Sequence, residues 1–184
     1  IVKLMKNSCK ICNSNKLNVI NDKKDKTKYF WCQECDFIFI DEKNIVDSNT
    51  ELEVYKKHDN TIENKGYVEM FERFIKKGIT PYCKSFGKVL EFGSGPGPVL
   101  AELLQRKEYD VDIYDPYFSP KKVYKNKKYD IITSTEVFEH FKDPLKEMDL
   151  LKNLLKKDGY LVIMTRFHPK SEEEFQKWWY RRDL

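Results

Sequence analysis

Long hydrophobic runs are missing from this chain of 184 residues. No apolar run approaches the roughly 20 residues that a membrane helix needs, and the N-terminus lacks the apolar core of a signal peptide. An excess of one charge is also missing, because the formal net charge is only +4 and Lys121 to Lys128 is the single basic cluster. We therefore expect a cytoplasmic protein that works away from membranes, and the charge gives no strong indication of nucleic-acid binding.

The composition is that of a folded protein, with 35% charged and 14% aromatic residues. Its length suits one ordinary domain with a small addition. We expect three parts, namely a small module over residues 1–40, a helical connector over residues 41–80, and a larger α/β domain over residues 81–184.

The cysteines are grouped in pairs. Cys9 and Cys12 form one C-x-x-C pair and Cys32 and Cys35 form a second. This arrangement is typical of a zinc site in which four thiolates surround Zn²⁺ tetrahedrally. Two disulfides are the alternative, which a cytosolic protein does not favour, and a redox C-x-x-C pair would leave the other pair unexplained. Cys83 lies outside the pattern, and we expect a buried or idle thiol there.

The residues around these cysteines predict a small ribbon. Asn13 and Asp36 follow the second cysteine of each pair, and both residue types tolerate the left-handed backbone that turns N–H groups toward sulfur. Tyr29–Trp31 and Phe37–Ile40 are expected to form strands. Residues 1–40 are too few to build an apolar core of their own, so we expect the metal to hold this module together.

The connector is expected to contain a helix over Thr50–Lys57 and a second, amphipathic helix that Gly78 ends. The apolar face of the second helix should pack on the sheet of the larger domain. That face is formed by residues at helical spacing, namely Tyr67, Met70, Phe71, Phe74 and Ile75.

The larger domain alternates predicted strands with predicted helices, which indicates a parallel sheet. Strands are expected at Lys88–Phe92, Val111–Tyr114, Tyr129–Ser134 and Tyr160–Thr165. We expect one helix over 98–107, with Pro98 at its first position, and another that Asp143 caps and Gly159 ends. A short further strand near Val123 would fit between the second and third of these strands.

The stretch Val89–Leu100 joins a short apolar run to a helical pattern through Gly93, Gly95 and Gly97. Glycine at alternate positions lets a ligand lie against the backbone, and we expect unpaired N–H groups at the start of the helix. Glu91 lies two residues before the first glycine, where a cationic ligand group could reach it. The stretch therefore indicates a nucleotide-cofactor site.

The pattern E-x-G-x-G-x-G at a strand end resembles the first motif of the class I S-adenosylmethionine-dependent methyltransferases. In the dinucleotide fingerprint the third glycine comes one residue later, where this chain has Pro98. The later segments of the chain keep the order of this family's motifs as far as Thr165. It includes Asp115 at the end of the second strand, the strand and loop over Tyr129–Phe141, and the helix-to-strand junction over 156–163.

This resemblance implies a Rossmann-like α/β fold in which residues 81–184 bind S-adenosylmethionine beside the zinc ribbon. The methionyl ammonium of the cofactor would lie near Glu91 and its ribose on Asp115. The implied cofactor-binding residues are Glu91, Gly93, Ser94, Gly95, Gly97, Asp115, Ser134 and Thr135. His140, just past the third of the four strands, is the candidate for acid–base chemistry. The alternative is that His140 hydrogen-bonds to backbone or to Glu136 and only braces the loop.

The implied function is methyl transfer from S-adenosylmethionine to an unidentified acceptor, with a small molecule or a sugar favoured. A zinc ribbon joined to such a domain resembles the sugar C-methyltransferases and other bacterial methyltransferases with cysteine-rich modules. Two alternatives stay open. One is a non-catalytic module that binds a cofactor or a partner, and the other is a nicotinamide-dependent oxidoreductase, which the glycine spacing disfavours.

Class I methyltransferases usually finish with two more strands, whereas only 19 residues follow Thr165. We therefore expect a fragment whose sheet has five strands or fewer, with the strand over 160–165 at an edge or covered by the terminal aromatic segment. An uncovered edge strand invites pairing, so a homo-oligomer is an expected consequence. Trp178 and Trp179 either pack on the sheet or form part of a substrate or partner surface.

Overall fold

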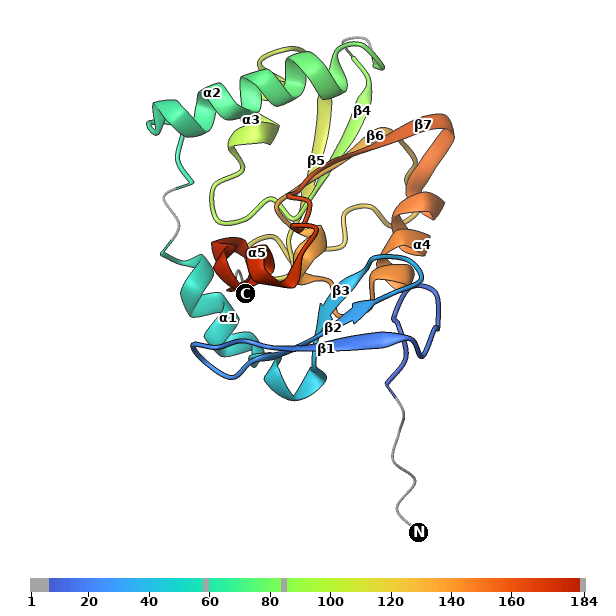
Figure 1. Ribbon diagram of the computed structural model, residues 1–184. Helices are drawn as coiled ribbons and strands as arrows, with labels where there is room; N and C mark the ends of the chain where they lie inside the picture. The colour runs from blue at the N-terminus through green and yellow to red at the C-terminus, as the bar shows by residue number, and fades with distance from the viewer. Residues whose placement is uncertain (1–6, 58–59, 84–85, 183–184) are drawn as a thin grey trace. The chain divides into compact units, whose positions relative to one another are not determined.

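The computed structural model describes residues 7–57, 60–83 and 86–182, which form two compact units (Figure 1). The first unit contains the residues up to Asp47, the short stretch Lys142–Lys146 and the segment from Arg166 onward. The second unit contains Ser48–Phe141 and Glu147–Thr165. This division differs from the expected boundaries, because the segment after Thr165 groups with the ribbon rather than with residues 81–165. Among the described residues, no helix is long and apolar enough to cross a membrane.

The first unit is built on a three-stranded antiparallel sheet in the order β1-β2-β3. Its central strand pairs Cys32 with Leu17 on one side and Tyr29 with Ile40 on the other. Strand β1 was not expected from the sequence. The elements of this unit are β1 (Leu17–Asn21), β2 (Lys28–Cys32), β3 (Ile38–Ile40), η1 (Glu42–Asn44), α5 (Glu172–Lys177) and η4 (Trp179–Arg182).

A small apolar core forms between this sheet and helix α5. Ile20, Tyr29 and Phe175 are buried together, and the rings of Tyr29 and Phe175 meet edge-on with centroids 5.2 Å apart. Trp178 packs against the same core, and so on the sheet of the first unit rather than on the expected sheet of the larger domain. Trp179 is instead 63% exposed. The ribbon therefore has an apolar core that residues 1–40 alone do not complete.

A buried ion pair ties the end of the described chain to the first unit. The carboxylate of Asp22 is fully buried and accepts hydrogen bonds from Arg181 Nε at 2.7 Å and Arg182 Nη2 at 2.8 Å. Burial alone would raise the pKa of Asp22. The hydrogen bonds from Arg182, the Lys24 backbone and Arg181 outweigh it and hold this pKa far below its ordinary value.

The second unit is built on a four-stranded parallel sheet in the order β5-β4-β6-β7. Its strands are β4 (Lys88–Phe92), β5 (Asp110–Tyr114), β6 (Tyr129–Thr135) and β7 (Leu155–Met164). The expectation of five strands or fewer is confirmed for the described residues, and β7 lies at an edge of the sheet. The further strand near Val123 is wrong, because this stretch consists of turns.

Helices cover both faces of this sheet (Figure 1). Phe71, Ile75 and Leu104 from the helices on one face pack with Val89 and other strand residues. On the opposite face, Leu151 and Leu154 of α4 pack with residues such as Leu90 and Ile132. The helices of this unit are α1 (Ser48–Tyr55), α2 (Lys65–Phe74), η2 (Ile75–Ile79), α3 (Val99–Gln105) and η3 (Phe138–His140), with α4 (Pro144–Leu154) beginning in the first unit.

Three expected helix boundaries are wrong. Gly78 lies inside the π-helical turn η2 instead of ending the helix, and a Cβ there would approach Val162 Cγ1 to 2.9 Å. Pro98 is the N-cap of α3 rather than its first residue, since its ψ of 58° is not helical. Helix α4 ends at Leu154 rather than at Gly159, because the next residue already pairs with Tyr129 in the sheet.

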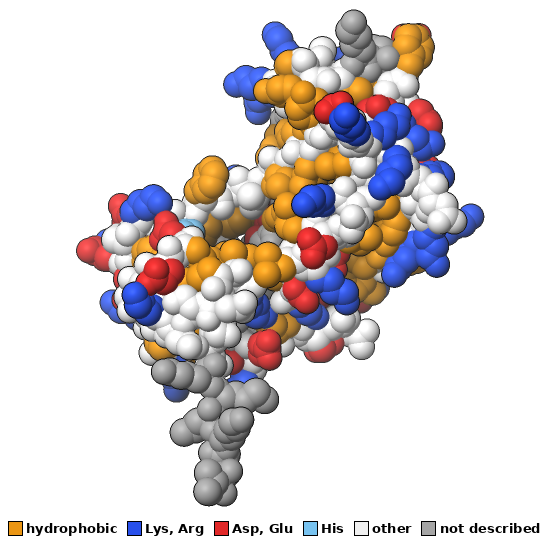
Figure 2. Space-filling view, turned by 90° about the vertical axis from the view of Figure 1, so that its right-hand side faces the viewer, with side chains coloured by type: hydrophobic (Ala, Val, Ile, Leu, Met, Phe, Trp, Pro, Cys, Tyr) orange, Lys and Arg blue, Asp and Glu red, His pale blue; other side chains and the backbone are white. Residues whose placement is uncertain are grey.

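On the face that Figure 2 shows, basic and acidic side chains are interspersed with apolar ones and no single-sign patch dominates. This distribution agrees with the small net charge of +4.

We expect Asp22→Asn to lower the free energy of unfolding of the first unit by about 3 kcal/mol, because the buried guanidinium of Arg181 would lose its charged partner. The three tryptophans all lie in this unit, so their fluorescence during urea unfolding measures the loss. In the wild type, the contribution of the Asp22 ion pair to the free energy of unfolding should be complete above the ordinary aspartate pKa of 3.8. It should be lost as the pH falls below this value. The control is Asp25→Asn, whose carboxylate is about half exposed, and an equal loss in the two variants would contradict the assignment.

Candidate cofactor site and metal centre

The turn between β4 and α3 requires glycine at specific positions. Gly93 and Gly95 have φ angles of 85° and 64°, in the left-handed region that side chains disfavour. A Cβ at Gly93 would overlap the side chain of Val137, and a Cβ at Gly97 would overlap the carbonyl oxygen of Asn60. The glycines therefore admit a tight turn and also let other parts of the chain approach its backbone closely.

Most N–H groups of this turn are satisfied within the protein, which corrects the expectation that they are unpaired. The N–H of Gly93 donates to Tyr114 O at 2.8 Å, and the N–H of Val99 donates to Gly97 O at 2.8 Å. The N–H of Gly95 donates to the Asp115 carboxylate at 2.9 Å. The turn is thus held in shape before any ligand arrives.

Glu91 is a buried carboxyl group at the carboxyl half of β4, with 3% of its surface exposed. Its Oε2 atom accepts a hydrogen bond from Ala101 N in the first turn of α3 at 3.0 Å. Burial is the main cause that raises the pKa of Glu91 to about 8, and the nearby charge of Asp115 adds to it. A cationic group placed beside Glu91 would favour its ionised form.

Asp115 follows the last residue of β5 and is also buried. Its Oδ2 atom accepts from Gly95 N, and its Oδ1 atom accepts from Tyr117 N at 2.8 Å and from Phe118 N at 3.0 Å. The structure therefore brings Asp115 against the glycine turn, as the sequence predicted. The same bonds fix the loop after β5.

Buried hydroxyl groups without a partner lie in this region. Within the described part of the chain, Ser94 Oγ and Ser134 Oγ are buried and make no hydrogen bond. Ser94 belongs to the glycine turn, and Ser134 lies near the end of β6 together with Thr135. Unsatisfied buried hydroxyls are rare in folded proteins and are consistent with partners supplied by a ligand.

His140 lies in η3, which follows β6. Its Nδ1 atom is buried and has no hydrogen-bond partner among the described residues, while its ring meets that of Tyr55 edge-on with centroids 5.6 Å apart. The backbone N–H of His140 donates to Val137 O at 3.0 Å. The ring is therefore held by packing, and its buried Nδ1 atom is left without a hydrogen-bond partner among the described residues.

Two residues near these side chains, Tyr67 and Glu136, were not predicted as site residues. Tyr67 of α2 is half-buried, and burial, followed by the charges of Glu91 and Glu136, raises its pKa to about 12. Glu136 itself has a φ of 54°, which is uncommon for a residue with a side chain. The sequence showed Tyr67 only as part of an apolar helix face, so no local signal distinguished it.

The four paired cysteines converge in the first unit. The Sγ atoms of Cys9, Cys12, Cys32 and Cys35 all lie within 4.8 Å of one another. The distances of 3.5 Å from Cys9 Sγ to Cys35 Sγ and from Cys12 Sγ to Cys32 Sγ are too long for disulfides. Four thiol groups at these separations suit a tetrahedral zinc shell.

The turns that carry these cysteines are alike. Asn13 and Asp36 have φ angles of 58° and 63°, which confirms the expected left-handed backbone. Their N–H groups donate to Cys9 O and Cys32 O at 3.0 and 3.1 Å. The N–H of Ile11 approaches Cys9 Sγ at 3.4 Å, as in a turn built to stabilise thiolate. The donor set therefore fits Zn²⁺ on chemistry and on geometry.

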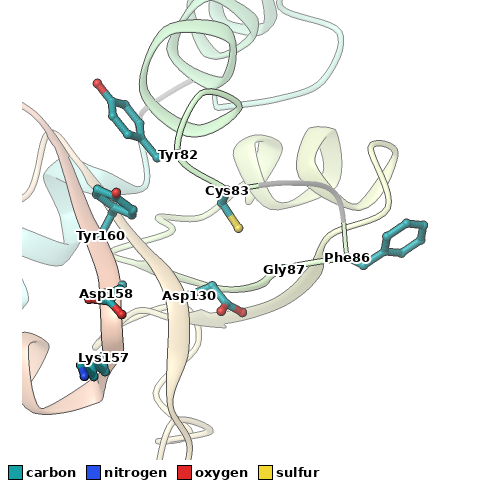
Figure 3. Close-up of a pocket in the computed structure, with 9 residues that line it drawn as sticks. Tyr82, Cys83, Phe86, Gly87, Asp130, Lys157, Asp158 and Tyr160 are labelled. Carbon is teal, nitrogen blue, oxygen red and sulfur yellow. The ribbon is translucent and has the colours of Figure 1, made fainter.

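An open hollow of about 390 Å³ lies at the opposite, amino end of the sheet in the second unit (Figure 3). Tyr82 and Tyr160 meet at one side with ring centroids 5.0 Å apart, and the thiol of Cys83 projects into it. Of the two acidic residues that line it, Asp130 is already paired with Lys156 at 2.8 Å. Ligands of open parallel sheets bind at the carboxyl ends of the strands, so this hollow is not the cofactor site.

A protein-family model described as "Methyltransferase domain" matches residues 66–183, which is more than half of the chain. Among solved structures, a crystal structure of coclaurine N-methyltransferase bound to N-methylheliamine and S-adenosylhomocysteine is similar at 19% sequence identity and a TM-score of 0.42. That match covers 59% of this chain and 39% of the other. No curated protein sequence gives a significant match.

We expect the purified protein to contain about one zinc ion per chain, measured by elemental analysis, because four thiolates complete the shell. Removal of the metal with a chelator should unfold the first unit and change the tryptophan fluorescence, since metal-binding energy is folding energy in such modules. Cys83→Ser is the matched control and should keep the full zinc content. A metal-free protein whose first unit stays folded would contradict the zinc site.

Proposed function

The chain belongs to the methyltransferase-domain family, and we propose that it transfers a methyl group from S-adenosylmethionine to a small-molecule or sugar acceptor. The observation that carries the cofactor assignment is the convergence of Glu91, the glycine turn and Asp115 at one edge of the sheet. This edge is formed by the carboxyl ends of β4 and β5, beside the point where the strand order reverses between β4 and β6. Open α/β sheets bind their ligands at such a switch point.

The residues at this edge suit the chemical groups of S-adenosylmethionine. Glu91 is a buried carboxyl group with one N–H partner, so the methionyl ammonium would supply the charge that favours its ionised form. Asp115 already accepts three N–H groups, so about one of its roughly four acceptor positions, on Oδ2, remains for a ribose hydroxyl. The free hydroxyls of Ser94 and Ser134 would complete the polar contacts, with Thr135 beside them.

When bound, the cofactor supplies an activated methyl group on a sulfonium centre. The chain would contribute position, because rigid strand ends and a pre-shaped turn hold the ligand groups in place. His140 is our candidate for accepting the proton of the nucleophile, since its buried Nδ1 atom lacks a partner and lies just beyond β6. In this proposal the zinc-bound ribbon has a structural role.

Asp115→Ala should weaken the binding of S-adenosylhomocysteine by about 1–3 kcal/mol, because the ribose hydroxyls lose their charged acceptor. Calorimetric titration of the folded variant measures the change. The matched control is Asp112→Ala on the same strand, which removes the partner of Lys127 and Tyr129 and should leave the affinity unchanged. Equal affinities in the wild type and the Asp115 variant would show that the cofactor site is elsewhere.

The affinity for S-adenosylhomocysteine should rise with pH between 6 and 8, because the free protein holds Glu91 mostly protonated below about 8 and an ammonium ligand requires its carboxylate. At most, the gain is about tenfold per pH unit. Glu91→Gln cannot ionise, so its affinity should be weaker and nearly constant over this range. A wild-type affinity independent of pH would remove Glu91 from the ligand contact.

A further inference from the structure

A second group of polar and aromatic side chains, separate from the cofactor contacts, gathers at the same edge of the sheet. Glu51 and Tyr55 of α1, Tyr117 from the loop after β5, and His140 of η3 form what we call the aromatic–carboxylate cluster. All four residues are half-buried, so each keeps part of its surface exposed to solvent. Helix α1 was expected only as part of a connector, and nothing in the sequence assigned it a role.

Two tyrosine hydroxyls fix the carboxylate of this cluster. Tyr55 donates to Glu51 Oε1 at 2.8 Å, and Tyr117 donates to Glu51 Oε2 at 2.7 Å. Donors on both oxygens hold this carboxylate in one orientation. A carboxylate has about four acceptor positions, so Glu51 can still accept hydrogen bonds from a ligand.

The rings of the cluster pack against one another. The Tyr55 ring lies 5.7 Å from that of Tyr117 at an interplanar angle of 57°, and 5.6 Å from the ring of His140 at 83°. Rings inclined to one another in this way present ring faces in different directions. Aromatic faces beside a carboxylate are the chemistry by which proteins recognise organic ammonium ions.

The electrostatic surroundings also favour a cation. Burial raises the pKa of Tyr117, and its hydrogen bond to Glu51 and the charges of Glu51 and Asp115 add to the shift. Two carboxylates therefore act on this position from different elements. Lys56, which directly follows α1, pairs with Glu53 on the exposed side of the helix at 2.8 Å.

We propose that the aromatic–carboxylate cluster binds an alkylammonium group of the methyl acceptor, so that the acceptor is a cationic small molecule. The position of the cluster supports this role, because Tyr117 lies two residues after Asp115 and His140 follows β6. The identification of the ligand as the acceptor rests on the proposed methyl transfer. The binding of an ammonium ion does not depend on it.

The test compares choline with 3,3-dimethylbutan-1-ol, which has nearly the same shape and no charge. Binding to the wild-type protein is measured by NMR titration of the tyrosine ring signals. We expect choline to bind at least about tenfold more tightly than the alcohol, as a charge- and ring-based site requires. Equal binding of the two, or no binding of choline to the folded protein, would overturn the proposal without any variant.

Variants then assign the site. Glu51→Gln keeps the shape of the side chain and removes its charge, and it should reduce the preference for choline about tenfold. Tyr117→Phe keeps the ring and removes one donor, and should reduce it less. Glu53→Gln is the control on the exposed face of the same helix and should change nothing. A choline preference that survives Glu51→Gln in a folded protein would contradict the cluster as the site.

A separate titration with S-adenosylhomocysteine distinguishes this proposal from the proposed function. If S-adenosylhomocysteine fails to bind while choline binds through Glu51, the methyl-transfer proposal fails and the ammonium site stands. If S-adenosylhomocysteine binds and choline does not, the cationic acceptor is excluded and methyl transfer stands.

Discussion

The carboxylate of Asp115 holds the carboxyl edge of the second unit together. One of its oxygens accepts the N–H of Gly95, and the other accepts the N–H groups of Tyr117 and Phe118. These bonds connect the turn after β4 to the loop after β5. They also place Tyr117 where its hydroxyl reaches Glu51 of α1. The proposed cofactor contacts and the proposed ammonium site therefore depend on a single buried side chain.

The glycine turn shows a second constraint, which is close packing of the chain on itself. Gly97 lies so near the Asn60 carbonyl that no larger residue fits, and Gly93 is similarly close to Val137. With most N–H groups paired inside the protein, the turn offers a pre-shaped surface rather than a row of free donors. The polar capacity left for a ligand lies in Glu91, Ser94 and Ser134. Holding Glu91 buried without a cation is costly, which is why its pKa rises.

Local patterns predicted the strands of the parallel sheet and the convergence of the four paired cysteines well, because hydrophobic period, glycine spacing and C-x-x-C pairs are short-range signals. Strand β4 and the left-handed Asn13 and Asp36 follow the expectation closely. Long-range partners were not predictable. Nothing near Phe175 indicates that it completes the core beside Tyr29, and nothing near Glu51 indicates that it accepts the hydroxyl of Tyr117 from the loop after β5. The early end of α4 has the same origin, since pairing of Leu155 with Tyr129 overrides the helical pattern.

The most direct test is calorimetric titration of the zinc-loaded wild-type protein with S-adenosylhomocysteine and, separately, with NADH. A class I methyltransferase site at the glycine turn predicts one S-adenosylhomocysteine bound per chain and no heat of binding for NADH. The third glycine of the turn comes one residue too early for the dinucleotide fingerprint, which disfavours NADH. The buried carboxyl group of Glu91 favours a ligand that carries an ammonium group. Binding of NADH in place of S-adenosylhomocysteine, or of neither ligand to the folded protein, would contradict the proposed cofactor.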